Sequence, residues 1–176
     1  MYNACLQLTE GLAYLHENGI AHRDLGAENI LANLNGVNNS SWHPRTKLYI
    51  IDLELASRYK KVIGPPCADY DRPCAPEVAE MKPHDPRAAD VWQLGMLIKE
   101  ALESMPNSPD EYRNMTSLCE LMSAIDPERR PSAQRASYEV RKQKMQHEQP
   151  SWNLWLFPNT LLSYIRAWID FLPTTQ

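Results

Sequence analysis

The sequence has no excess of positive charge. Its 18 lysine and arginine residues are outnumbered by 22 aspartate and glutamate residues, which gives a net charge of -4 at pH 7. Binding to the phosphate backbone of a nucleic acid depends on basic side chains that neutralise it. We therefore expect no nucleic-acid partner, and any binding of phosphate groups has to be local and assisted by a metal ion.

Cysteine pairs of the C-x-x-C type are absent, although the chain contains Cys5, Cys67, Cys74 and Cys119. None of the four stands at metal-ligand spacing from a histidine. We expect free thiols in a reducing compartment, with a bridge between Cys67 and Cys74 as the alternative. Residues 1–20 also lack the basic start and small-residue cleavage site of a signal peptide. These features predict an intracellular protein, located in the cytoplasm.

No uninterrupted hydrophobic run is long enough to cross a membrane. Residues 152–172 come nearest, but a proline, an asparagine, Arg166 and Asp170 interrupt them. Charged side chains are costly in hydrocarbon. From Leu161 onward, apolar side chains recur instead on one face of a helix. The pattern predicts no transmembrane segment but an amphipathic helix docked on the domain, with contact at a membrane surface as the alternative.

The other patterns predict a mostly α-helical chain with a small β element. Helical periodicity and capping residues indicate helices over 4–16, 88–105, 117–125 and 133–146. Runs rich in β-forming residues indicate two short strands, 29–32 and 47–56. The polar residues 33–46 between them predict a surface hairpin. Residues 57–87 show little periodicity, so we expect an irregular segment with one helical turn after Pro76.

A short loop carries the first chemical signature. The stretch HRDLGAEN places His22, Arg23, Asp24 and Asn29 in the pattern H-R-D-L-x-x-x-N, which is the catalytic-loop motif of protein kinases. Four further blocks follow in the order that the family has them. IDLE stands where the family has its D-F-G triplet, and CAPE contains the A-P-E triplet. DVWQLG then matches the family's D-x-W-x-x-G helix, and DPERRPS matches its R-P motif.

From about residue 4 to 145 the chain therefore resembles the C-terminal lobe of a eukaryotic protein kinase. The resemblance implies a kinase-like C-lobe over residues 1–146, followed by a C-terminal extension over 147–176 that contains the amphipathic helix. The aromatic-rich stretch SWNLWLFPN of the extension is similar to kinase-like proteins of mushroom-forming fungi.

The resemblance also implies roles for individual residues. Asp24 would accept or orient the proton of the substrate hydroxyl, and Arg23 would tie the loop to the activation segment. Asn29 and Asp52 would hold the magnesium ions that bridge the phosphates of ATP. Phosphoryl transfer needs positioning and charge neutralisation more than covalent help, which explains carboxylates and an amide at these places.

Other matching residues would be structural. Asp90 would cap the backbone of the catalytic loop, and Glu77 and Arg130 would form a buried ion pair. Trp92 belongs to the same structural set. We interpret His22 as a packed core residue rather than a base.

The sequence also departs from the family pattern. It contains no G-x-G-x-x-G-x-V loop and no V-A-I-K lysine, the features of the N-terminal lobe that hold ATP. We expect the N-terminal lobe to be absent, so that this chain alone binds ATP poorly and is inactive. Gly26 replaces the usual basic residue after the catalytic aspartate, and Glu54 replaces the glycine of D-F-G.

Two functions fit these observations. The first is a protein kinase domain, represented by a truncated chain, that uses ATP and magnesium to phosphorylate protein hydroxyls, with serine or threonine favoured over tyrosine. The alternative is a pseudokinase or kinase-derived protein-binding module without activity. A small-molecule phosphotransferase is disfavoured, because the A-P-E and R-P motifs belong with a platform for protein substrates.

Overall fold

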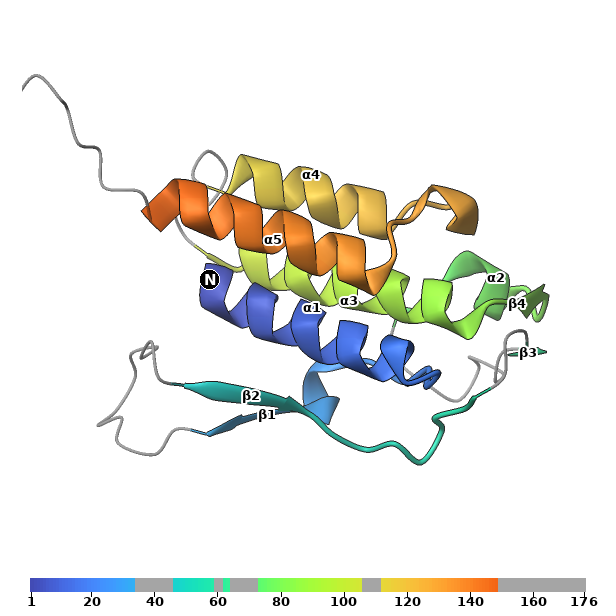
Figure 1. Ribbon diagram of the computed structural model, residues 1–176. Coiled ribbons are helices and arrows are strands. Elements are labelled where there is room, and N and C mark those ends of the chain that lie inside the picture. Colours follow the sequence, from blue (N-terminus) through green and yellow to red (C-terminus); the bar gives the residue numbers. More distant parts are fainter. Residues whose placement is uncertain (34–45, 59–61, 64–72, 106–111, 149–176) are drawn as a thin grey trace, which may run out of the picture. The chain divides into compact units, whose positions relative to one another are not determined.

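Helices carry most of the residues that the structure describes. The computed structural model describes residues 1–33, 46–58, 62–63, 73–105 and 112–148, and the chain divides into two units, Met1–Lys144 and Met145–Gln176. Four longer helices lie side by side (Figure 1): α1 (Tyr2–Glu17), α3 (Pro86–Glu103), α4 (Arg113–Met122) and α5 (Ala133–Glu148), of which the last four residues belong to the second unit.

One apolar core joins these four helices. Leu12 of α1, Leu94 of α3, Met115 of α4 and Val140 of α5 are all fully buried in it. The buried positions of α3 from Val91 to Leu102 recur at helical spacing, so they share one broad face of the helix, and this face lies in the core. Burial of such side chains is the main favourable term in folding.

A small antiparallel hairpin packs against α1. It consists of β1 (Ile30–Asn33) and β2 (Lys47–Ile50), with Ile30 opposite Ile50 and Asn33 opposite Lys47. Gln7 of α1 fastens the start of β2: its Nε2 donates to the carbonyl of Thr46 (3.1 Å), and its Oε1 accepts from the N–H of Leu48 (3.1 Å). The hairpin follows directly on the HRDLGAEN loop, through the 3-10 turn η1 (Ala27–Asn29).

Short elements connect the hairpin to α3, and another connects α4 to α5. They are β3 (Val62–Ile63), which pairs antiparallel with β4 (Pro83–His84), the one-turn helix α2 (Pro76–Ala79), and the 3-10 turn η3 (Pro127–Arg129). Asp85 begins α3 by accepting the N–H of Arg87 at 3.0 Å, and Asp126 begins η3 in the same way through the N–H of Glu128. A side-chain cap of this kind satisfies a backbone donor that has no partner within the helix.

The predicted mostly helical architecture with a small β element is confirmed. Two boundaries are wrong: the helix predicted from 117 begins at Arg113, and the strand predicted to reach residue 56 ends at Ile50. The segment predicted to be irregular, 57–87, contains the β3–β4 pair as well as the expected turn at Pro76. The loop after Asn33 and the extension from residue 149 onward lie outside the described residues.

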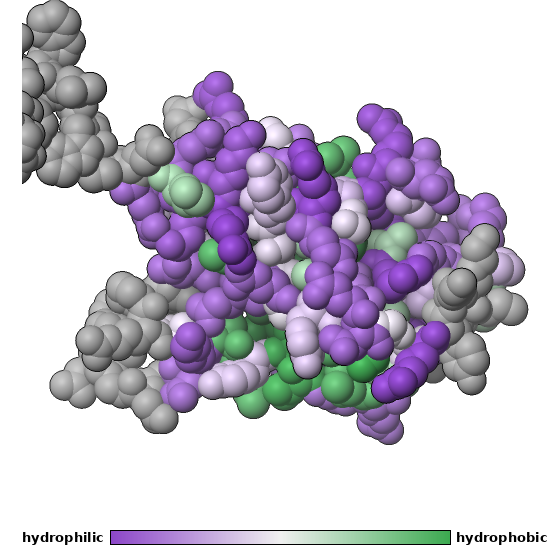
Figure 2. Space-filling model, in the orientation of Figure 1, coloured by the Kyte–Doolittle hydropathy of each residue, from purple (hydrophilic) through white to green (hydrophobic). Residues whose placement is uncertain are grey.

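On the face shown in Figure 2, the surface is mostly polar over the helices and apolar beside the hairpin. Figure 2 shows apolar side chains gathered along the hairpin side of this face. A shallow pocket of about 240 Å³ lies there between α1 and β2, lined by Leu15, Ile50 and Leu53 among others. In the part of the chain that the structure describes, no helix has the length and hydrophobicity needed to cross a membrane.

Candidate functional site

The HRDLGAEN loop is held on the first half of α3 by a buried carboxylate. Asp90 is fully buried. Its Oδ1 accepts the backbone N–H of Arg23 at 2.6 Å, and its Oδ2 accepts the N–H of His22 at 2.8 Å. The same Oδ2 lies 2.9 Å from Nε2 of His16 on α1. A buried carboxylate is stable only with such partners, so Asp90 fixes the loop to two helices at once.

His22 connects the loop to the segment that carries Asp52. Its Nδ1 accepts the N–H of Asp24 (3.3 Å), and its Nε2 lies 2.9 Å from the carbonyl oxygen of Ile51. A ring nitrogen that accepts a hydrogen bond carries no proton, so Nε2 is the nitrogen that donates. The fully buried imidazole therefore spans the loop and the residue before Asp52, which is a structural task.

Asn29 lies against Asp24. Its Nδ2 donates to the backbone oxygen of Asp24 at 2.8 Å and to the carboxylate Oδ2 at 3.0 Å. Its backbone oxygen accepts the N–H of Ile51 at 2.9 Å. The amide nitrogen thus faces Asp24, and the amide oxygen, the atom that can bind a cation, lies on the other side of the group. Ile51 accepts a hydrogen bond from His22 and donates one to Asn29, and these two bonds bring the chain that leads to Asp52 beside the loop.

Two residues of the site have a left-handed backbone. Arg23 has φ 72° and Asp52 has φ 63°, a conformation that costs a residue other than glycine about 1–3 kcal/mol. Neighbouring hydrogen bonds hold both in place, through Asp90 at the first and Ile51 at the second. At Asp52 the turn ends strand pairing and leaves the side chain exposed.

The donor atoms of Asn29 and Asp52 fit a magnesium ion. An amide oxygen and a carboxylate are hard ligands of the type that Mg²⁺ takes, and Mg²⁺ is usually bound by few protein groups together with water and phosphate oxygens. In the described ranges, no group of three or more histidine, cysteine, aspartate or glutamate side chains could hold a metal ion. Asn29 and Asp52 supply two protein oxygens of the ligand type that Mg²⁺ takes together with water and phosphate oxygens.

Arg23 is placed differently from its neighbours. Among the residues that the structure describes, no acceptor bonds to the buried Nε of its guanidinium. The activation segment, which the sequence predicts to contact it, falls largely in residues 59–61 and 64–72, outside the described ranges. The contact between Arg23 and that segment stays a prediction.

A buried ion pair anchors α2 to the turn before α5. Arg130 donates to the Glu77 carboxylate at 2.6 and 2.9 Å. The other donors of its guanidinium reach the carbonyls of Ala88, Ala124 and Ile125. Trp92 packs on the same region, against the small cluster formed by Ala75, Val78 and Ala89. These groups hold the scaffold around α3, away from Asp24 and Asp52.

Two residues of the site were not predicted from the sequence. His16 bonds Asp90. Gln93 accepts the N–H of Leu25, the residue after Asp24, at 3.1 Å. The spacing gives a signal for Gln93, because it follows Asp90 by three residues and so lies on the same face of α3.

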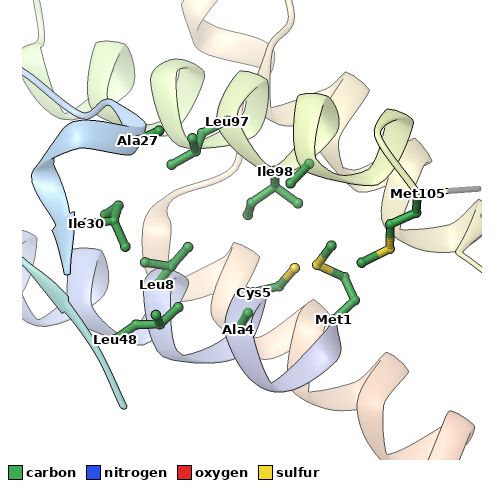
Figure 3. Close-up of a pocket in the computed structure, with 11 residues that line it drawn as sticks. Met1, Ala4, Cys5, Leu8, Ala27, Ile30, Leu48, Leu97, Ile98 and Met105 are labelled. Atoms are coloured by element: carbon green, nitrogen blue, oxygen red, sulfur yellow. The ribbon is translucent and has the colours of Figure 1, made fainter. Parts of the chain in front are cut away.

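A separate apolar cavity of about 370 Å³ lies between α1, α3 and the hairpin. Figure 3 shows Cys5, Leu8, Ile30, Leu97 and Ile98 pointing into it. Neither Asp24, Asn29 nor Asp52 belongs to its lining. A lining without charges does not suit phosphate groups, so this cavity is distinct from the polar site.

The motifs and their geometry agree with a comparison to known families. A model of the protein kinase domain matches residues 1–146. The chain belongs to the protein kinase family. This kinase-family chain is 32% identical over 168 residues, or 93% of its length, to the cytokinesis protein sepH of Aspergillus terreus. It is 29% identical over 142 residues (78% of the chain) to the serine/threonine-protein kinase CST20 of Candida albicans.

A third relative comes from outside the fungi. The mitogen-activated protein kinase kinase kinase A of Dictyostelium discoideum is 32% identical over 119 residues, or 68% of the chain. The chain spans 11% of the length of sepH, 10% of CST20 and 11% of the Dictyostelium kinase.

Proposed function

We propose that this chain carries the catalytic loop and the metal-binding residues of a protein kinase site that transfers a phosphoryl group from ATP to serine or threonine hydroxyls of a protein. The kinase-like C-lobe would occupy residues 1–146, and 147–176 would be an extension. The proposal is supported above all by the hydrogen bonds that join Asp24, Asn29 and the residue before Asp52. CST20 is named a serine/threonine-protein kinase, which favours those hydroxyls.

Each residue of the site would have a separate role in phosphoryl transfer. When bound, ATP with magnesium supplies the phosphoryl group and neutralises its negative charge. Asn29 and Asp52 would hold the cation through oxygen atoms. Asp24, whose carboxylate is oriented by Asn29, would accept a hydrogen bond from the substrate hydroxyl and orient its oxygen towards the phosphorus. His22 and Asp90 hold the backbone of the loop that carries Asp24 in place.

A protein-binding module without activity is the second candidate. It is favoured by Gly26, which removes a positive charge expected beside Asp24, and by Glu54, which adds a negative one after Asp52. The glycine-rich loop and V-A-I-K lysine are also absent from these 176 residues, so we expect weak nucleotide binding by this chain alone. An intracellular location and the lack of a nucleic-acid partner remain predictions from the sequence.

Thermal unfolding of the 176-residue chain with millimolar ATP, with and without Mg²⁺, separates the two candidates. A ligand that binds the folded state raises the unfolding midpoint by mass action. We expect a small, magnesium-dependent rise that Asp52→Asn removes. Glu120→Gln, which removes one charge from an exposed site on α4, is the matched control and should keep the rise.

An unchanged midpoint at millimolar ATP and Mg²⁺ would favour the binding module. Phosphorylation of a protein substrate, followed with labelled ATP, is the second arm. Any transfer should disappear in Asp24→Asn, and persistence of transfer in that variant would exclude Asp24 as the catalytic residue.

A further inference from the structure

Each of four successive backbone N–H groups in the catalytic loop bonds to a side chain. The N–H groups of His22 and Arg23 donate to Asp90, that of Asp24 to Nδ1 of His22, and that of Leu25 to Oε1 of Gln93 at 3.1 Å. Leu25 is only 3% exposed, so its N–H depends on Gln93 for an acceptor within the fold.

We propose that Gln93 is a positioning residue that holds the catalytic loop on α3 at Leu25, directly after Asp24. An effect on phosphoryl transfer rests on the proposed function, whereas the positioning itself does not. Asp90 and Gln93 lie about 4.5 Å apart along the axis of α3. They hold the loop on both sides of Asp24, at residues 22 and 23 before it and at residue 25 after it.

The surroundings show why this bond matters in this chain. Gly26 follows Leu25 with extended backbone, φ -141° and ψ 170°, and has no side chain to pack on α3. A cavity of about 500 Å³ opens between the loop and α3 at this point, and Gln93 and Met96 form part of its wall. Packing is therefore sparse on this side, and the Gln93 hydrogen bond provides the polar attachment to α3.

The orientation of the Gln93 amide is fixed by this bond. Only its oxygen can accept the N–H of Leu25, so the amide nitrogen points to the other side of the group. A side chain of similar length but without an acceptor should release Leu25, and one that keeps an acceptor should hold it. Methionine and glutamate meet these two conditions.

Amide hydrogen exchange in the full 176-residue chain, read by NMR, tests the proposal. In Gln93→Met we expect exchange at Leu25 to rise by about five- to a hundredfold, the equivalent of an unsatisfied buried donor. The matched control is Gln7→Met, because Oε1 of Gln7 also accepts a backbone N–H at 3.1 Å, from Leu48. There exchange should rise at Leu48 and stay unchanged at Leu25.

Rescue by Gln93→Glu completes the test, since its carboxylate restores the acceptor and should restore protection at Leu25. Unchanged exchange at Leu25 in Gln93→Met would overturn the proposal. Equal loss of protection at Leu25 in Gln7→Met would also overturn the proposal, because the faster exchange would then reflect general destabilisation of the fold. The exchange measurement requires neither nucleotide nor activity, so it stays readable if the proposed function fails. Where transfer is measurable, kcat should fall in Gln93→Met with KM little changed.

Discussion

At the scale of single residues, the site combines backbone strain with hydrogen bonds that maintain it. Arg23 and Asp52 adopt left-handed conformations, and each is flanked by residues whose backbone groups are bonded across the fold. Asparagine is among the residues that tolerate this conformation. Asp52→Asn therefore changes charge and ligand strength without adding backbone strain, which makes it a clean test of the metal role.

The ion pair of Glu77 and Arg130 leads to a prediction about stability. Their side chains are 9% and 1% exposed, so loss of one partner leaves a buried charge. We expect Arg130→Met or Glu77→Met to lower the free energy of unfolding by about 3–5 kcal/mol. The double variant should lose less than the sum of the two single losses, because neither charge is then left alone. Urea unfolding of the three variants measures this.

The control for this prediction is the exposed pair of Glu80 and Lys82, with side chains 55% and 67% exposed. Lys82→Met should change the free energy of unfolding by less than about 1 kcal/mol, since water screens the pair. Additive losses at Glu77 and Arg130 would contradict a direct energetic coupling.

At the scale of secondary-structure elements, α3 organises both the core and the site. Its buried positions contact α1 and α4, while Asp90 and Gln93 hold the catalytic loop. A close approach to α4 occurs at Gly95, where an added Cβ would lie 2.7 Å from the Cβ of Met122. The close packing therefore explains why the DVWQLG motif has glycine at this position, because any side chain there would separate the two helices.

Gly95→Ala should therefore destabilise the protein despite the higher helix propensity of alanine. Overpacking of this kind costs about 1–3 kcal/mol, which exceeds the gain of up to about 1 kcal/mol from replacing glycine in a helix. Gly11→Ala in α1 is the control, because its Cβ would meet only the flexible end of Ile50 at 3.3 Å. It should be neutral or slightly stabilising. A Gly95→Ala variant as stable as the parent in urea would contradict the close packing.

The sequence predicted elements where local pattern determines them. Apolar spacing was enough for α1 and α3, and a capping residue indicated the polar helix α5. The ends of all three match the predictions within a few residues. The early end of β2 could not be read locally, because Ile51, Leu53 and Leu55 alternate with polar residues as they would in a half-buried strand. It follows from the left-handed turn at Asp52 and from the bonds of Ile51 to His22 and Asn29, which come from a distant loop.

At the scale of the whole unit, the site exists only as a product of the fold. The bond between Leu25 and Gln93 joins residues 68 positions apart in the chain, and that between His22 and Ile51 joins residues 29 apart. Motif order could predict that Asp24, Asn29 and Asp52 belong together, but not how they are held. Tertiary hydrogen bonds such as that of Gln93 follow from helix placement, which local patterns do not contain.

The core itself contains two titratable groups that report on its integrity. Cys5 of α1 and Cys119 of α4 are free thiols, 1% and 0% exposed. Cys74 is also free, so it takes part in no disulfide. Burial raises the pKa of Cys5 from 9.0 to about 11 and that of Cys119 from 9.0 to about 12, because the apolar core disfavours the thiolate.

Stability should consequently fall as the pH rises above about 9. The unfolded chain loses these thiol protons near pH 9, whereas the folded chain retains them up to about pH 11 for Cys5 and pH 12 for Cys119. The unfolded state therefore binds fewer protons over this range, and the free energy of unfolding decreases with pH. Below pH 9 the two thiols contribute no pH dependence.

Urea unfolding at pH 8, 9 and 10 tests this expectation, and the quantity to compare is the slope of the free energy of unfolding against pH rather than its absolute value. The double variant Cys5→Ala, Cys119→Ala is less stable throughout, because it leaves small cavities, but its stability should fall less steeply above pH 9. Val140→Ala also opens a cavity at a fully buried core position without removing a titratable group, so it should keep the steeper slope of the parent. Equal slopes in the parent and the double cysteine variant would show that the thiols ionise as readily in the folded core as in the unfolded chain.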